Sequence, residues 1–310
     1  MAAQRQVLPP AAPGGAPRWH FQHGPIDLVI GADGEPAAVA AAHAAAWAGF
    51  EGLLAELVAE LAVLRTPVAA TGHNPLRGLV AQRMWSACAP LARPAMGWPA
   101  RFLTPMAAVA GAVAEQLIAA YRRPGIARAW VNNGGDIALH LAPGQQLRAG
   151  LVADIAGLDA AAWSRTVMGR GTPDGRFVVH ADDPVRGIAT SGWRGRSRSL
   201  GVADSVTVLA ASAAMADAAA TVVANAVDLP HPGIVRRPAE DLHDDSDLGT
   251  IPVTVAVPAL TPAERERALA AGLAVARRLQ ARGLLQAAVL VCQGSLATLP
   301  PVPALQSAAA

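Results

Sequence analysis

A strand–turn–strand pattern at the centre of the chain restricts the fold more than any other sequence feature. Apolar residues 127–132 lead into the turn 132–136, Asn-Asn-Gly-Gly-Asp, and residues 137–141 leave it. Asn and Gly tolerate the positive φ angles of tight hairpin turns, so the pattern predicts two neighbouring antiparallel strands. Further strands are expected at about 25–30, 148–154, 177–180, 186–190 and 205–210.

Segments with helical patterns flank these strands on both sides. Leucines at helical spacing predict a helix over residues 37–65. Thr104 followed by Pro105 fits the start of another helix, which runs to about residue 121. Helices are also expected over about 75–88 and 212–225.

The last third of the chain contains a helix between two expected strands, 251–257 and 284–291. Residues 261–264, Thr-Pro-Ala-Glu, form a capping box with proline at the first helical position. Together these segments predict a β-α-β unit. Because no convincing linker divides the chain, we expect one α+β domain over residues 18–310, with mixed β-sheets flanked by helices. A flexible Pro/Gly/Ala-rich arm of residues 1–17 is expected to precede it.

The composition excludes several kinds of chemistry. All 25 basic residues are arginine, so no lysine is available for a Schiff base or a phosphate-binding loop. The two cysteines, Cys88 and Cys292, predict neither a disulfide framework nor a zinc site. The formal net charge of +2 gives no reason to expect a nucleic-acid partner.

The sequence shows neither a membrane span nor a targeting segment. The longest apolar stretches, around 37–50 and 206–224, are Ala-rich and are interrupted by His43 and Asp217. The first residues carry no apolar core typical of a signal peptide. We therefore expect a cytoplasmic protein without a membrane partner, and the sequence does not predict its oligomeric state.

One polar stripe lies on the expected helix 212–225. Asp217, Thr221 and Asn225 occupy positions i, i+4 and i+8 of an otherwise apolar helix. A carboxylate and a hydroxyl one turn apart can share a hard cation such as Mg²⁺, which prefers oxygen ligands. A solvated helix edge, or an Asp217 that caps a neighbouring loop, explains the same spacing. Periodicity does not choose between these interpretations.

Two loops could bind an anion. The turn 132–136 could present backbone amides to a phosphate, or it could be an ordinary hairpin turn. Residues 189–192, Ala-Thr-Ser-Gly, are followed by Arg194, Arg196 and Arg198, whose guanidinium groups suit a diphosphate. An exposed arginine loop without a ligand is the alternative.

Three of these segments, in this order, resemble motifs of the ApbE superfamily, the FAD:protein FMN transferases. They are residues 130–137, residues 188–192, and the strand–helix pattern over 205–221. The small-residue segment 108–115 resembles the helix that lies beside the metal in that family. Residues 24–30 and 104–111 are similar to one branch, uncharacterised protein family 0280, which extends the resemblance over most of the chain.

The resemblance implies an ApbE-like fold that binds FAD in a cleft, with Mg²⁺ near the FAD diphosphate. The family's metal-binding pattern falls on Asp217, the backbone carbonyl of Ala220 and Thr221, with a further carbonyl near Val109. The residues implied in nucleotide binding are Asn133, Gly134, Gly135, Asp136, Thr190, Ser191, Gly192, Arg194 and Arg196.

The chain departs from the family at a position that matters for catalysis. The histidine that follows Ala-Thr-Ser-Gly in flavin transferases, usually credited as general base, is missing here, and Asp204 could fill part of that role. Three hypotheses follow. The protein could pass FMN from FAD to an acceptor protein or to water, or bind flavin as an accessory protein for a redox enzyme. It could also run a different metal-dependent reaction on the same fold.

Overall fold

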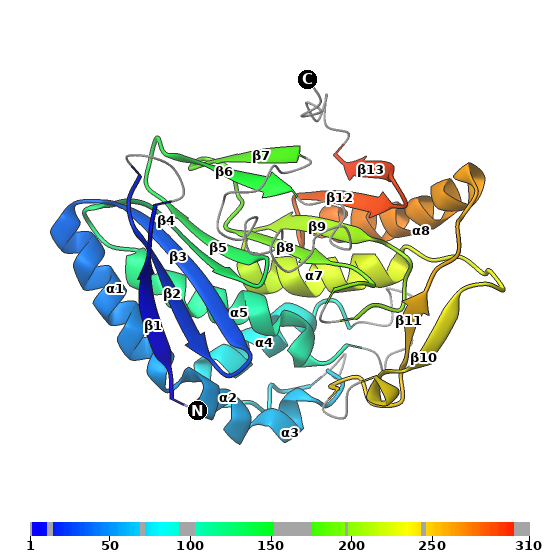
Figure 1. Cartoon of the computed structure of the whole chain (residues 1–310), viewed down its shortest axis with the longest axis horizontal. Coiled ribbons are helices and arrows are strands. Elements are labelled where there is room, and N and C mark those ends of the chain that lie inside the picture. Colours follow the sequence, from blue (N-terminus) through cyan, green and yellow to red (C-terminus); the bar gives the residue numbers. More distant parts are fainter. Residues whose placement is uncertain are drawn as a thin grey trace.

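Nine strands of the described part of the chain form one antiparallel sheet (Figure 1). The computed structural model describes residues 2–10, 15–68, 72–92, 103–151, 175–195, 198–242 and 246–300. In spatial order the strands are β1 (Gln4–Leu8), β2 (Arg18–His23), β3 (Ile26–Gly34), β4 (Ile126–Asn133), β5 (Asp136–Leu141), β8 (Gly187–Ser191), β9 (Ser205–Ala210), β12 (Ala287–Cys292) and β13 (Ser295–Leu299). The expected α+β class with flanking helices is confirmed, although the strand pairings in the described residues are antiparallel rather than mixed.

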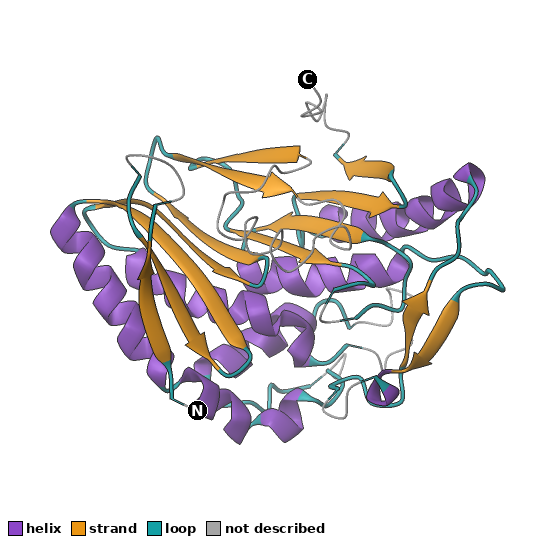
Figure 2. Cartoon of the chain, viewed as in Figure 1, coloured by secondary structure: helices purple, strands orange, loops and turns teal. Residues whose placement is uncertain are grey.

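Helices gather on one side of the strands (Figure 2). They are α1 (Pro36–Glu51), α2 (Leu53–Ala59), α3 (Leu61–Leu64), α4 (Leu79–Cys88), α5 (Val109–Ile118), α7 (Ala213–Ala226) and α8 (Pro262–Ala281), with 3₁₀ turns η2 (Pro105–Ala108), η3 (Ala119–Tyr121) and η4 (Ala239–Asp241). Because side chains alternate along a strand, Val206 and Val208 of β9 face this helical layer, whereas Leu209 faces away from it.

A second, smaller core covers part of the opposite face. The hairpin of β6 (Gln146–Leu151) and β7 (Gly175–His180) packs there, with Val179 against Leu139, Ile188 and Leu209. A separate two-stranded ribbon of β10 (Val235–Pro238) and β11 (Pro252–Ala256) lies beside the main sheet. The main sheet is therefore covered on both faces near its centre, where β5, β8 and β9 meet.

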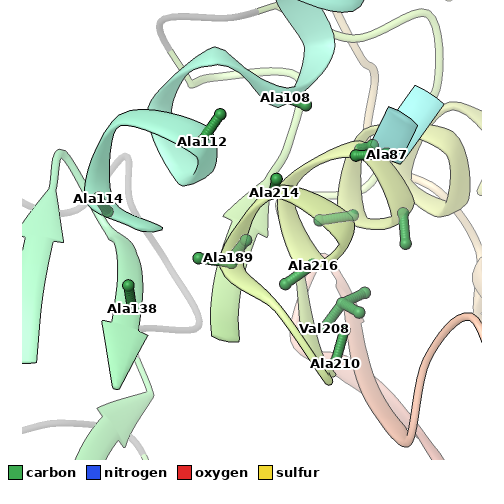
Figure 3. Close-up of a cluster of buried hydrophobic side chains, with 14 of the residues drawn as sticks. Ala87, Ala108, Ala112, Ala114, Ala138, Ala189, Val208, Ala210, Ala214 and Ala216 are labelled. Atoms are coloured by element: carbon green, nitrogen blue, oxygen red, sulfur yellow. The ribbon is translucent and has the colours of Figure 1, made fainter. Parts of the chain in front are cut away.

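Alanine fills the contact between this central part of the sheet and the helices. The close-up in Figure 3 shows side chains from α4, α5 and α7 packed over β5, β8 and β9. Ala114, Ala138, Ala189 and Ala216 are all fully buried or nearly so. Small side chains let backbones approach closely, so this region brings helix termini and strand ends together instead of separating them with bulky side chains.

Three expectations about the elements need correction. The helix expected over 37–65 is broken into α1, α2 and α3. The first break is at Gly52, the C-cap of α1, and the second is at Glu60, whose carboxylate accepts from the backbone N–H groups of Arg77 and Gly78 at 2.8 and 2.7 Å. The β-α-β unit is wrong, since β11 before helix α8 pairs with β10 while β12 after it joins the main sheet. A crossover unit needs both strands in one sheet.

The third correction concerns the expected flexible arm. Gln4–Leu8 forms strand β1, which pairs antiparallel with β2 at the edge of the sheet. The guanidinium group of Arg5 lies 5.8 Å from the Trp19 ring centroid and 5.0 Å from that of Trp47. Such cation–π contacts hold the strand in place although most of its side chains are exposed.

One helical stretch in the described part of the chain, Pro36–Ala59, is long and apolar enough to cross a membrane by length and composition alone. In the structure, Gly52 divides this stretch between α1 and α2. Ala42, Ala46 and Phe50 of α1 are buried in the main core. This packing is typical of a helix that covers a sheet.

Candidate functional site

Helices α5 and α7 cross so closely that a carboxylate of one helix reaches the first turn of the other. The backbone N–H of Gly111 donates to Asp217 Oδ2 at 2.9 Å. A Cβ on Gly111 would lie 2.2 Å from the Ala213 carbonyl oxygen and 2.9 Å from Asp217 Cβ. Glycine is therefore required at 111 for the backbones to come this close, and the close approach brings Asp217 to α5.

The same crossing places a carboxylate of α5 at the first turn of α7. Glu115 Oε2 accepts from the backbone N–H of Ala214 at 3.1 Å, and Arg83 Nε lies 3.2 Å from Glu115 Oε1. Each helix thus receives a carboxylate from the other at its amino end, where unpaired N–H groups and the helix dipole favour negative charge. Glu115 is paired with the Arg83 guanidinium group, whereas the charged side chain that acts on Asp217 is a second acid, Asp136.

The turn between β4 and β5 binds the amino end of α5. Gly134 and Gly135 have φ angles of 65° and 116°, and the expected hairpin is confirmed. Asn133 Nδ2 donates to the Ala110 carbonyl at 3.1 Å. The amide of Gly135 donates to Asn132 Oδ1 at 2.8 Å, so this amide is already used within the turn and is not free for a phosphate.

Asp136 begins β5 on the helix-facing side of this turn. Its Oδ1 accepts from the backbone N–H of Thr190 at 3.1 Å, which ties the turn to β8. The Thr190 hydroxyl pairs with that of Thr207 at 2.8 Å. Asp136 is only 9% exposed, so its carboxylate adds negative charge to a site where water screens it poorly.

This arrangement holds the Asp217 carboxyl in an unfavourable environment for its charge. Burial raises the pKa of Asp217 well above its usual value, and the nearby Asp136 carboxylate raises it further, against opposing hydrogen bonds from Gly111 and Ala110. Burial also raises the pKa of the Cys88 thiol, and the Asp217 charge adds to that shift. A cation between the two carboxylates would offset this repulsion.

The residues expected to hold a metal lie together only in part. Asp217 binds the backbone N–H of Gly111, two residues after Val109 in the first turn of α5, while Ala220 and Thr221 follow about one turn along α7. Ala220 is buried and Thr221 is partly exposed. Among the described residues, no group of three His, Cys, Asp or Glu side chains is arranged to hold a metal. Mg²⁺ in proteins takes one or two carboxylates and completes its shell with other oxygens, so the chemistry of Asp136 and Asp217 is compatible with that ion.

Asp204 lies directly before β9. Its Oδ2 accepts a short hydrogen bond from the backbone N–H of Gln293, in the turn between β12 and β13. Gly192 packs against it, since a Cβ on Gly192 would lie 2.3 Å from the Asp204 carbonyl oxygen. The residue is 8% exposed and supports a turn in which Gln293 has a φ of 45°.

The loop after β8 carries the expected arginines. Arg194 is exposed and its guanidinium group lies 4.6 Å from the Trp193 ring centroid. Arg196 lies outside the described residues. Ser191 is 5% exposed, and its hydroxyl has no hydrogen-bond partner among the described residues. A buried unpaired hydroxyl costs free energy, so a ligand or water oxygen beside Ser191 would be stabilised.

Sequence reasoning did not identify the contacts that several residues of this site make. Gly111 and Glu115 belong to the small-residue segment, but their contacts with α7 depend on how two distant helices cross. Thr207 was assigned only to a strand. The pattern Gly-x-x-x-Glu at 111–115 was the available signal: a close approach followed one turn later by a carboxylate.

Comparison with known proteins gives the family. A family model described as "AbpE bacteria" matches residues 8–298. The chain belongs to this family. The chain is also similar to curated proteins named UPF0280 protein: one from Methanosphaerula palustris is 37% identical over 131 residues, covering 42% of this chain and 48% of that protein. One from Methanospirillum hungatei is 35% identical over 128 residues, covering 40% and 46%.

The matched region thus spans about half the length of these relatives. A crystal structure of the Pseudomonas stutzeri flavinyl transferase ApbE in its apo form aligns with 96% of this chain and 93% of its own, at 16% identity and a TM-score of 0.44. The resemblance inferred from the motifs, to ApbE-like proteins and to their uncharacterised branch, is confirmed by the family model and the relatives.

Proposed function

We propose that this protein binds FAD together with Mg²⁺ at the crossing of α5 and α7. The observation that carries the proposal is the pair of carboxylates, Asp136 and Asp217. Burial and mutual repulsion raise the pKa of Asp217, while Gly111 orients its carboxylate. Family membership and the motif resemblance favour a flavin nucleotide as the ligand that arrives with the cation.

In this proposal Asp217 and Thr221 provide side-chain oxygens to the metal, with backbone carbonyls from Ala220 and the segment around Val109. Bound Mg²⁺ would offset negative charge on the FAD diphosphate. The turn 133–136 and residues 190–192 would line the nucleotide. Arg194 and Arg196 would approach the phosphates from the loop after β8.

The proposed reaction breaks the FAD diphosphate and passes its FMN part to a hydroxyl of an acceptor protein or to water, with AMP as the leaving group. Asp204 is the proposed base that would take the proton of that hydroxyl. The observed hydrogen bond from Gln293 to Asp204 favours a second candidate function. In that case Asp204 is structural, and the protein is a cytoplasmic flavin-binding accessory to a redox enzyme without transferase activity.

The test is a titration with FAD, with and without Mg²⁺, followed by analysis of the nucleotide products. We expect Mg²⁺ to tighten FAD binding about tenfold or more, the factor that one good charge interaction supports. Asp217→Asn should remove this Mg²⁺ effect. Asp33→Asn, which alters a surface ion pair with Arg128, should keep it.

The products separate the candidates. FMN or AMP would establish an enzyme, and stoichiometric FAD without turnover would establish a binding protein. If FAD binds under neither condition, the proposed function is wrong, and a different metal-dependent reaction on the same fold becomes the better hypothesis.

A further inference from the structure

Asn225 is the third member of the polar stripe on α7, and neither the metal nor the nucleotide proposal uses it. It lies two turns beyond Asp217 and is 7% exposed. Its Oδ1 accepts two hydrogen bonds, from the backbone N–H of Leu200 and from the Ser199 hydroxyl, both at 2.8 Å. Because the Leu200 N–H can only donate, this contact fixes which side-chain atom of Asn225 is the oxygen.

This orientation leaves the side-chain nitrogen of Asn225 without a hydrogen bond in the described part of the chain. Asn225 Nδ2 is buried and has no hydrogen-bond partner among the described residues. Leaving a buried donor unpaired is unfavourable, and turning the amide would instead leave the Leu200 N–H facing another donor. The side chain is therefore held by its contacts with residues 199 and 200.

Further bonds fix the same short segment on its other side. The Ser199 hydroxyl accepts from the Gly201 N–H at 3.1 Å. Thr254 of β11 donates from its N–H to the Ser199 carbonyl at 2.9 Å and from its hydroxyl to the Leu200 carbonyl at 3.0 Å. Arg236 of β10 also donates to the Leu200 carbonyl, at 3.0 Å. Segment 199–201 is thus clamped between α7 and the β10–β11 ribbon.

This clamp closes the loop that carries the arginines. Arg194 lies five residues before Ser199, where the clamp begins. Arg198, directly before Ser199, has a φ of 54°, which is rarely adopted by residues other than glycine. At the far end of the clamp, a Cβ on Gly201 would lie 2.1 Å from the Ala224 carbonyl oxygen, so the chain touches the α7 backbone itself. The end of α7 therefore determines where the arginine loop returns to the core.

We propose that Asn225 is a positioning residue, which fixes the loop that carries Arg194 and Arg198 relative to Asp217, in the amino-terminal half of α7. Asp217 and Asn225 are eight residues apart on one rigid helix, or about 12 Å at 1.5 Å per residue. The helix would set the separation between a cation site and the loop that carries Arg194 and Arg198. This suits a ligand with a cation-bound anionic group, such as a nucleotide diphosphate, and in that respect the inference rests on the proposed function.

The first experiment needs no ligand: it measures amide hydrogen exchange at Leu200 in the full-length protein. Asn225→Ala removes the acceptor and should speed exchange of the Leu200 amide about tenfold or more relative to the rest of α7. Asn225→Asp keeps an oxygen at the same place and should restore the protection. Ser212→Ala is the matched control, because it removes the N-cap bond to the Met215 N–H at the other end of the same helix.

The second experiment measures FAD affinity in the presence of Mg²⁺ for the same variants. Asn225→Ala should weaken FAD binding about tenfold, while Ser212→Ala should stay within about twofold of the unaltered protein. If Asn225→Ala does not fold, Ser199→Ala provides a milder variant, which should weaken protection of the Gly201 amide and FAD binding in parallel.

The outcomes separate this inference from the proposed function. Unchanged exchange at Leu200 in Asn225→Ala, or an equal increase in Ser212→Ala, overturns the positioning role. Faster exchange with unchanged FAD affinity overturns the link to the ligand. If the unaltered protein binds no FAD, the proposed function fails, while the exchange result still decides whether Asn225 holds the loop.

Discussion

The N-terminal part of the sheet and its centre are packed in opposite ways. Only 4% of residues are aromatic, yet many of them gather between β2, α1 and η3 in what we call the aromatic wing: Trp19, Phe21, Trp47, Phe50 and Tyr121. The centre, where α5 and α7 cross over β5 and β8, is filled mainly with alanine (Figure 3), and Gly111 lies at the crossing itself.

This difference has a functional consequence. Aromatic side chains bury a large area each and keep backbones apart, which stabilises the wing without exposing polar backbone groups. In the centre the backbones themselves touch, and the Gly111 N–H and the Ala110 carbonyl both bind side chains from other elements. The wing should therefore determine stability, whereas the centre should determine ligand binding.

The largest expected effect concerns the wing. Phe21 is fully buried, with its ring centroid 5.1 Å from that of Trp47 and 5.4 Å from that of Phe50. Phe21→Ala should lower the free energy of unfolding by about 3–5 kcal/mol, measured by chemical denaturation. Its FAD affinity, measured well below the melting temperature, should stay near that of the unaltered protein. Val7→Ala, at an exposed site on β1, is the control; a large loss of FAD affinity in Phe21→Ala would break the comparison.

The second effect is a pH dependence that also belongs to the wing. Burial lowers the pKa of His43 to about 4 from its usual 6.5, and its Nδ1 lies 2.7 Å from the Tyr121 hydroxyl. Between pH 4 and pH 6.5 the unfolded state binds more protons at His43 than the folded state does. The free energy of unfolding should therefore fall by up to about 3 kcal/mol as the pH drops from 6.5 to 4. His43→Gln should flatten this slope, and His180→Gln, at an exposed site, should not. Equal slopes in both variants would contradict the assignment.

Local turn chemistry explains what could be predicted from the sequence. The β4–β5 hairpin and the capping box at Thr261 were found because their signals lie within a few residues. The helix with the polar stripe was also confirmed as α7. The residues of the stripe do not share one partner: Asp217 binds α5, and Asn225 binds the segment 199–200. Spacing along one helix cannot show which distant backbone meets each residue.

The errors have the same origin. Strand β1 was missed because residues 4–8 have little apolar signal of their own and are held by pairing with β2. The strand β11 was expected near its position, but the sequence could not show that its partner is β10. The turn and capping signals that lie within a few residues gave correct assignments, whereas the breaks in the helix expected over 37–65 and the choice of each strand's partner depend on distant contacts that only the structure shows.

The third effect tests the centre. Gly111→Ala places a Cβ against the Ala213 carbonyl, so α5 and α7 must separate, at a cost of about 1–3 kcal/mol. Since the separation withdraws Asp217 from the Gly111 N–H, the effect of Mg²⁺ on FAD binding should be lost, unlike in Phe21→Ala. Gly49→Ala is the matched control, because a Cβ there meets nothing within 4 Å in helix α1, and it should stabilise the protein by about 0.5–1 kcal/mol. A Gly111→Ala variant with an unchanged Mg²⁺ effect would separate the helix crossing from metal binding.

The smallest expected effect is that of Asp217→Asn on the free energy of unfolding without ligand, and it tests whether the centre is built for a cation. The raised pKa of Asp217 means that its contribution to stability is complete at low pH and declines as the pH rises through the folded-state pKa. Asp217→Asn keeps an oxygen for the Gly111 N–H but removes the charge, so without Mg²⁺ it should be more stable than the unaltered protein at pH 8 by about 1 kcal/mol. Added Mg²⁺ should raise the melting temperature of the unaltered protein and not of the variant. A variant that is less stable at pH 8 would show that the Asp217 charge already has a favourable partner, and that the pair of carboxylates does not call for a cation.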